Sequence, residues 1–154
     1  MKVLPLRTLA LAALLWAMIA ASVATAQTGP QPPLPTVRLT AGIHVIQAEV
    51  ATSTDERATG LMFRREMAPN AGMLFRFEQS SVHCFWMRNT LLPLSIAFLA
   101  DDGSVVGIAD MKPQTTESHC ADKPVRFALE MNQGWFARRG IQPGSRLQGG
   151  PFGK

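Results

Sequence analysis

Residues 94–110 read LSIAFLADDGSVVGIAD, two apolar runs separated by Asp101, Asp102 and Gly103. An Asp-Gly pair between apolar runs predicts a β-hairpin, because these residue types tolerate the positive φ angles of a tight turn. We therefore expect strands at 94–100 and 104–110. Short apolar runs of the same kind recur along the chain and are bounded by turn-forming residues. They predict further strands at 73–77, 84–89, 125–131 and 146–148.

The residues before this hairpin add two strands and a helix to the prediction. Residues 37–50 alternate loosely between apolar and polar around Gly42, which predicts two short strands. Ser53 and Glu56 then have the spacing of a capping box, so a helix is expected at about 54–59, ended by Gly60. A second helical segment is expected at 135–139.

Many short strands with one or two short helices favour a mainly β fold, a compact antiparallel sandwich, jelly-roll or barrel. The sequence shows no repeated strand–helix unit, so we do not expect a parallel sheet. The alternative is a layered α+β fold.

The first 26 residues have the pattern of a cleavable secretory signal. Lys2 and Arg7 precede an apolar run at 9–21, and Ala24–Ala26 supplies a small-x-small end. The run is too short to span a membrane comfortably. We expect a signal at 1–26, a Pro-rich linker at 27–36, one domain at 37–149 and a tail at 150–154. The mature chain would be periplasmic or secreted, with no stable membrane span, and monomeric.

Loss of the signal brings the chain close to neutral. Of 15 basic residues, Lys2 and Arg7 leave with it, so 13 remain against 11 acidic ones. The remaining arginines are scattered and form no stripe suited to phosphate tracking, so nucleic acid is not an expected partner.

The mature chain keeps two cysteines, Cys84 and Cys120, each preceded by a histidine, His83 or His119. Three interpretations stay open. In an oxidising compartment the cysteines would form a structural disulfide. Two thiolates and two imidazoles would also suit zinc or cuprous copper, although neighbouring residues of a strand point to opposite faces. Cys84 could instead be a nucleophile with His119 as its base.

A second candidate site follows Cys84. Period-two alternation places Cys84, Trp86 and Arg88 on one face of the segment, and its other face carries Phe85, Met87 and Asn89. An aromatic ring beside guanidinium, amide and hydroxyl groups is suited to binding a small polar ligand. Glu130 lies within an apolar run, so an inward-facing carboxylate there would require a partner such as Arg57 or Arg88. The candidate ligand-binding residues are Trp86, Arg88, Asn89, Thr90, Glu130 and Arg57.

Several ordered motifs resemble the family grouped as domain of unknown function 192, small bacterial and archaeal proteins that are often exported. The motifs are RATGLMFR at 57–64, GMLF at 72–75, FWMRNT at 85–90, PLSI at 93–96, Asp102-Gly103 and ALEMNQG at 128–134. The resemblance implies a mainly β jelly-roll or barrel with no established reaction, substrate or cofactor. Ser95 stands where that family usually has an acidic residue, and Arg88 where it often has Lys. The two cysteines lie outside its pattern, which favours a disulfide particular to this chain.

We therefore expect a non-enzymatic binding domain of the cell envelope, without a cofactor and with a small polar or envelope-derived ligand. The alternatives are a hydrolytic or redox envelope enzyme using Cys84 and His119, and a protein that handles copper or zinc.

Overall fold

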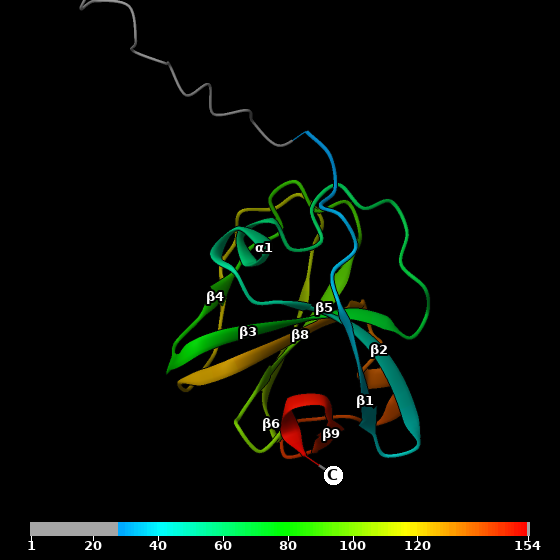
Figure 1. The fold of residues 1–154 in the computed structure, drawn as a ribbon, viewed down its shortest axis with the longest axis vertical. Helices are drawn as coiled ribbons and strands as arrows, with labels where there is room; N and C mark the ends of the chain where they lie inside the picture. The colour runs from blue at the N-terminus through cyan, green and yellow to red at the C-terminus, as the bar shows by residue number, and fades with distance from the viewer. Residues whose placement is uncertain (1–27, 154) are drawn as a thin grey trace, which may run out of the picture.

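The computed structural model describes residues 28–153, and the predicted signal at 1–26 lies outside this range. The fold is mainly β, as predicted (Figure 1). Its elements, in chain order, are β1 (Thr36–Ala41), β2 (His44–Ala51), α1 (Thr54–Thr59), β3 (Ala71–Ser81), β4 (Cys84–Phe85), β5 (Leu94–Leu99), β6 (Val105–Met111), β7 (His119–Cys120), β8 (Val125–Asn132), η1 (Ala137–Arg139), β9 (Leu147–Gly149) and η2 (Gly150–Phe152).

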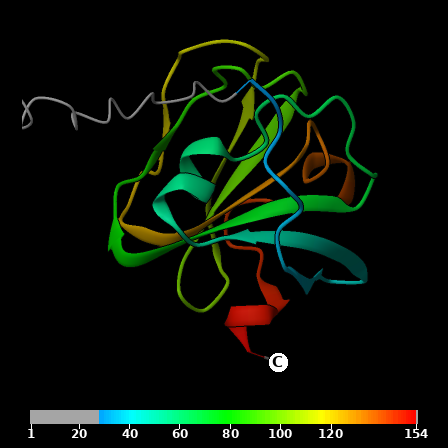
Figure 2. The ribbon, with the colours of Figure 1, turned by 45° about the horizontal axis from the view of Figure 1, so that its top comes forward.

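One curled seven-stranded sheet runs in the order β6-β5-β8-β3-β2-β1-β9, and a short ribbon of β4 and β7 lies apart from it. Figure 2 shows the curl and the position of α1 over one face of the sheet. The edges of the sheet meet at one end, where Ser104 pairs with Arg146 and the backbone of Leu147 donates to Gly103 at 2.9 Å. The sheet is therefore a partly closed barrel.

The strongest local signals of the sequence are confirmed. Antiparallel β5 and β6 form the predicted hairpin, and Gly103 adopts a φ of +84° in its turn. The helix α1 occupies 54–59, begins at the capping box of Ser53 and Glu56, and ends at Gly60.

The sheet is antiparallel apart from one pair, and one predicted strand is shorter than expected. β2 and β3 pair in parallel, because α1 and the loop after it form a single crossover between them. The predicted strand at 84–89 stops at Phe85, and Asn89 adopts a φ of +58°, which interrupts an extended chain. The predicted helix at 135–139 is a 3₁₀ turn at 137–139, closed by Gly140 in the left-handed conformation.

The segments predicted as linker and tail both contact the sheet. Gln31 donates to the backbone oxygen of Gly60 at 2.8 Å, and the backbone of Leu34 donates to the Glu49 carboxylate at 2.8 Å. Phe152 in η2 is buried against Phe127, with ring centroids 5.0 Å apart. These contacts fix the N-terminal segment beside α1.

Apolar side chains cover both faces of the sheet. On β8, Phe127, Leu129 and Met131 face one cluster, which also contains Trp135. Ala128 faces the second cluster, which lies under α1 and the β4–β7 ribbon. Since side chains alternate along a strand, Glu130 projects to the same side as Ala128 and enters the second cluster.

Candidate functional site

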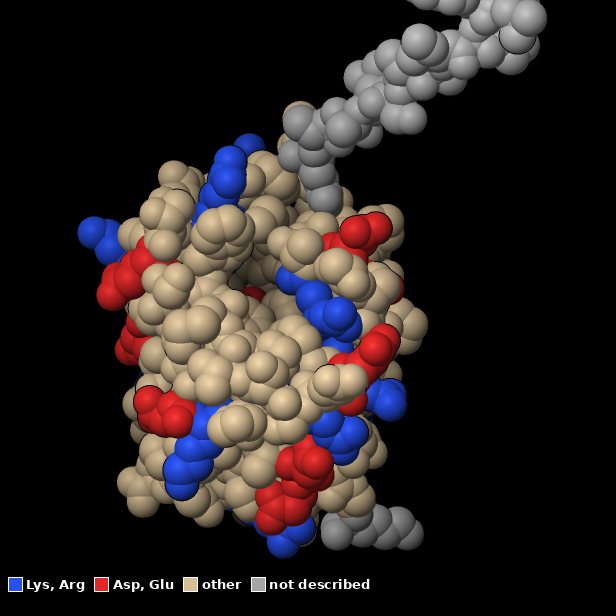
Figure 3. All heavy atoms as spheres, turned by 90° about the vertical axis from the view of Figure 1, so that its left-hand side faces the viewer, with Lys and Arg blue, Asp and Glu red and all other residues tan. Residues whose placement is uncertain are grey.

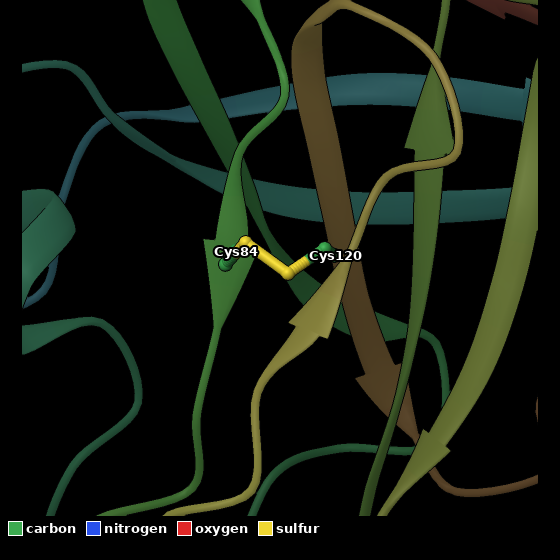
Figure 4. Close-up of a disulfide and its surroundings, with 2 residues drawn as sticks. All are labelled: Cys84 and Cys120. Atoms are coloured by element: carbon green, nitrogen blue, oxygen red, sulfur yellow. A yellow bond between two sulfur atoms is a disulfide. The ribbon is translucent and has the colours of Figure 1, made fainter.

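A disulfide joins Cys84 to Cys120 and holds the β4–β7 ribbon together (Figure 4). The two residues face each other in the antiparallel register, with their Cα atoms 4.0 Å apart. The disulfide prediction is confirmed. Neither sulfur is then the free thiolate that the nucleophile and metal hypotheses require. Among residues 28–153, no group of three or more His, Cys, Asp or Glu side chains is arranged to hold a metal ion.

The two histidines of the ribbon have structural surroundings. The His83 ring stacks on Phe77, with centroids 3.5 Å apart. The Nε2 atom of His119 is buried and has no hydrogen-bond partner within the described part of the chain. His119 lies opposite Phe85 in the register of the ribbon, beside the disulfide.

Side chains alternate along the first half of the segment that follows the disulfide. Cys84, Trp86 and Arg88 are exposed, whereas Phe85 is half-buried and Met87 is fully buried. The alternation ends at Asn89, which is exposed although the pattern predicted it to face inward. Its positive φ angle turns the chain there, so Thr90 becomes the next buried residue.

A cavity of about 370 Å³ lies between α1, the start of the loop after it, β3, β8 and the segment 84–90. Figure 3 shows this side of the molecule as a hollow with an acidic group at its floor and basic groups along its rim. The volume is within the usual range for small-molecule sites. The lining residues are Thr54, Arg57, Ala58, Thr59, Gly60, Leu61, Met62, Phe75, Phe77, Cys84, Phe85, Trp86, Thr90 and Glu130.

Among the described residues, Glu130 is the only acidic one that lines this cavity. Its side chain is buried, with 4% of the residue exposed, and the opposing residues in the neighbouring strands are Met73 and Ile96. No ion pair or hydrogen bond to its carboxyl group is found among the described residues. Burial raises the pKa of Glu130 to about 8, because no neighbouring cation or donor stabilises the charged form.

The cation partners proposed for Glu130 are engaged elsewhere. The guanidinium of Arg57 donates to the backbone oxygens of Thr52 and Arg76 and lies 5.1 Å from the centre of the Phe77 ring. The guanidinium of Arg88 lies 5.9 Å from the centre of the Trp86 ring. The predicted pairing of Glu130 with Arg57 or Arg88 was therefore wrong, and within residues 28–153 the carboxyl group, which faces the cavity, has no ion-pair partner.

Four of the six candidate ligand-binding residues line the same cavity: Arg57, Trp86, Thr90 and Glu130. Arg88 and Asn89 do not line it, because the turn at Asn89 directs this part of the chain outward. An aromatic wall that was not predicted also lines the cavity and consists of Phe75 and Phe77 of β3 with Phe85. The period-two spacing of Phe75 and Phe77 was the available signal, since residues two apart share a face of a strand.

The residue that departs from the family pattern, Ser95, has a structural role. Its hydroxyl group donates to the carboxylate of Asp110 on β6 and accepts from the backbone of Gly134 at 2.8 Å. The guanidinium of Arg88, where the family often has Lys, lies over the Trp86 ring. Neither residue lines the cavity.

The chain is therefore a small, partly closed β-barrel domain with a buried acidic residue lining one of its surface cavities. The sequence matches the family model DUF192, described as an uncharacterized ACR, over residues 36–149. The chain belongs to this family.

The solved structures similar to the chain include two that are 37% identical to it. One is a protein from Sinorhizobium meliloti that carries a provisional name as a transcription regulator, 37% identical, with a TM-score of 0.72, covering 77% of this chain and 97% of that one. The other is a protein of unknown function from Novosphingobium aromaticivorans, also 37% identical with a TM-score of 0.72, covering 80% of this chain and 93% of that one. No curated protein matches the sequence.

Proposed function

We propose that this chain is an exported, non-enzymatic binding domain that takes up a small ligand in the cavity under α1. The observation that carries the proposal is the unpaired carboxyl group of Glu130 at the floor of this cavity. A buried ionisable group without a partner costs stability, so its presence in an accessible cavity is explained by a ligand that supplies the partner.

The other lining residues support a ligand with an apolar body. Leu61, Phe75, Phe85 and Trp86 supply apolar surface, and Thr90 adds a buried hydroxyl group. Sites for small molecules usually combine such a lining with a few polar groups that fix orientation. Trp86 is 48% exposed, which leaves part of a large apolar side chain available for contact at the mouth of the cavity.

Two observations support export. The first 26 residues have the pattern of a cleavable signal. The Cys84–Cys120 disulfide is typical of proteins in an oxidising compartment. Within residues 28–153, no helix has the length and apolar character needed to cross a membrane. A periplasmic or secreted chain that begins at Gln27 is the expected mature form, and the intact mass of protein recovered from the periplasm tests this.

The binding function is tested by blocking the cavity. Ala58 is an exposed residue of α1 that lines it, so Ala58→Trp places a large side chain at its mouth without altering the core. Ala137, an exposed residue of η1 that does not line the cavity, provides the matched control Ala137→Trp. The measurement is a ligand-observed NMR screen of small molecules against the mature protein. We expect ligands that bind the wild type and Ala137→Trp but not Ala58→Trp, and equal binding to all three proteins would contradict the proposal.

A further inference from the structure

The charged groups of the cavity define which ligand would complement it. Apart from Glu130, Arg57 is the only charged side chain that residues 28–153 contribute to the lining. The strands β3 and β4 and the segment after β4 contribute aromatic and hydroxyl groups and the sulfur of a disulfide. The guanidinium of Arg57 already has two backbone oxygens and an aromatic ring as partners. The group that lacks a partner is therefore an acid, and its complement is a hydrogen-bond donor, preferably a positively charged one.

The aromatic wall favours a cation over a neutral donor. Phe75 and Phe85 meet edge to face, with centroids 4.9 Å apart, and Trp86 lines the mouth of the cavity. The face of an aromatic ring attracts cations, and aromatic side chains beside a carboxylate are an established means of binding ammonium groups. Two such contacts exist within the chain: the guanidinium of Arg57 lies over the Phe77 ring, and that of Arg88 lies over the Trp86 ring.

Building on the proposed function, we propose that the cavity under α1 binds an organic ammonium compound, a primary amine on an apolar or aromatic body, with its ammonium group on Glu130. The body would lie against Leu61, Phe75 and Phe85. A ligand with a carboxylate at the same depth would meet Glu130 with like charge. A metal ion would find one carboxylate, because the cavity lining contains no other Asp or Glu and no His.

The ammonium compound couples its binding to the release of a proton. In the empty cavity burial raises the pKa of Glu130 to about 8, so at pH 7 the carboxyl group is mostly protonated. A bound ammonium group supplies the missing positive charge and favours the carboxylate, and the carboxyl proton leaves to solvent. Since only the ionised fraction binds the cation, the apparent affinity should rise by about ninefold from pH 6 to 7 and by about fivefold from pH 7 to 8.

A neutral ligand that accepts a hydrogen bond from the protonated carboxyl group would behave in the opposite way. Its affinity should be constant below pH 8 and fall above it, because it binds the form that is lost. The sign of the pH dependence therefore separates the two kinds of ligand. The other charged group of the lining is Arg57, whose guanidinium donates to the backbone oxygens of Thr52 and Arg76.

The experiment uses three probes with one aromatic body: 2-phenylethylamine, 2-phenylethanol and 3-phenylpropanoate. Each is titrated into the mature, disulfide-bonded protein at pH 6, 7 and 8, with affinity measured by calorimetry or ligand-observed NMR. We expect the amine to bind most tightly and to gain about ninefold in affinity from pH 6 to 7 and about fivefold from pH 7 to 8. Glu130→Gln, which keeps the size of the side chain, should weaken amine binding at pH 8 and abolish the pH dependence.

The outcomes distinguish this inference from the proposed function. If the alcohol or the carboxylate binds as tightly as the amine, and Ala58→Trp abolishes that binding, the cavity is a binding site but the ammonium assignment is overturned. An amine affinity that stays constant from pH 6 to 8 overturns the assignment as well. If no probe binds, or if Ala58→Trp leaves binding unchanged, both proposals fail.

Discussion

Glu130→Gln should stabilise the protein, and the gain should grow with pH. Between the ordinary pKa of 4.5 and the value of about 8 in the folded chain, the unfolded state loses the carboxyl proton while the folded state keeps it. Unfolding therefore becomes more favourable as pH rises through this window. Below pH 4.5 both states are protonated and the contribution vanishes, whereas above pH 8 the whole penalty is present.

The magnitude follows from the same two values. Each pH unit inside the window corresponds to about 1.4 kcal/mol, so the full penalty approaches about 5 kcal/mol. Because the folded group begins to ionise near pH 8, the change expected between pH 5 and pH 8 is about 3.5 kcal/mol. That is a large part of the stability of a domain of this size.

The assay is equilibrium unfolding in urea at pH 5, 6, 7 and 8, with the disulfide intact, for wild type and Glu130→Gln. The quantity compared is the difference in free energy of unfolding between the two proteins, because groups that titrate alike in both cancel. A difference that does not change between pH 5 and pH 8 would refute the conclusion that Glu130 is buried and unpaired.

Glu49→Gln is the matched control, with the opposite sign. The hydrogen bonds from the Arg64 guanidinium are the largest cause of the lowered pKa of Glu49, and the backbone of Leu34 also donates to it. Its stabilising contribution is therefore complete above its ordinary pKa and is lost as pH falls below that value. Glu49→Gln should destabilise the protein by an amount that stays constant from about pH 5 to 8.

Three further results are expected from single changes. Replacing Cys84 and Cys120 together with Ser should lower the free energy of unfolding by about 4 kcal/mol in non-reducing urea titrations, because the disulfide closes a loop across a separation of 36 residues. Gly103→Ala should cost about 2 kcal/mol more than Gly140→Ala, since both residues have positive φ but only at Gly103 would the new Cβ atom lie 2.2 Å from a backbone oxygen. Trp86→Ala should change stability by less than about 1 kcal/mol because the residue is half exposed, while weakening 2-phenylethylamine binding at pH 8.

Each of these comparisons has a result that would count against it. Equal stability of the double Ser variant and the wild type would mean that the disulfide does not constrain the unfolded chain. Equal costs for the two glycine substitutions would mean that the contact at Gly103 relaxes freely. Loss of folding in Trp86→Ala would show that this side chain belongs to the core.

Local signals in the sequence predicted most of the sheet. The Asp102-Gly103 turn and the Ser53–Glu56 capping box each depend on residues close in sequence, and both are present as expected. The parallel pairing of β2 with β3 was not predictable in this way, because it depends on where α1 packs. Asn89 was likewise predicted to belong to a strand. The chain turns there instead, because the side chains of Met87 and Thr90 on either side are both buried.

The part of the candidate site that was predicted also consists of residues that local features of the sequence identify. Glu130 and Trp86 were identifiable because a charge inside an apolar run and an aromatic ring beside polar groups are local features. The residues that complete the cavity come from α1 and β3, and only the crossover between β2 and β3 brings them over β8. The elements themselves were predicted, whereas the parallel connection that brings them together to build the site was not.

The position of Glu130 in the fold links the two proposals. β8 lies between β5 and β3, so Glu130 is flanked on both sides by paired backbone and by the apolar side chains of Ile96 and Met73. Such a central strand holds the carboxyl group in one place, and relaxation toward solvent would break pairs on both sides. The floor of the cavity is therefore rigid, whereas its mouth is formed by the short helix α1 and by Trp86 beyond the end of β4. A cationic ligand that enters between them meets a carboxyl group held in a fixed position. Its positive charge offsets the free energy that burial of the ionised carboxylate costs.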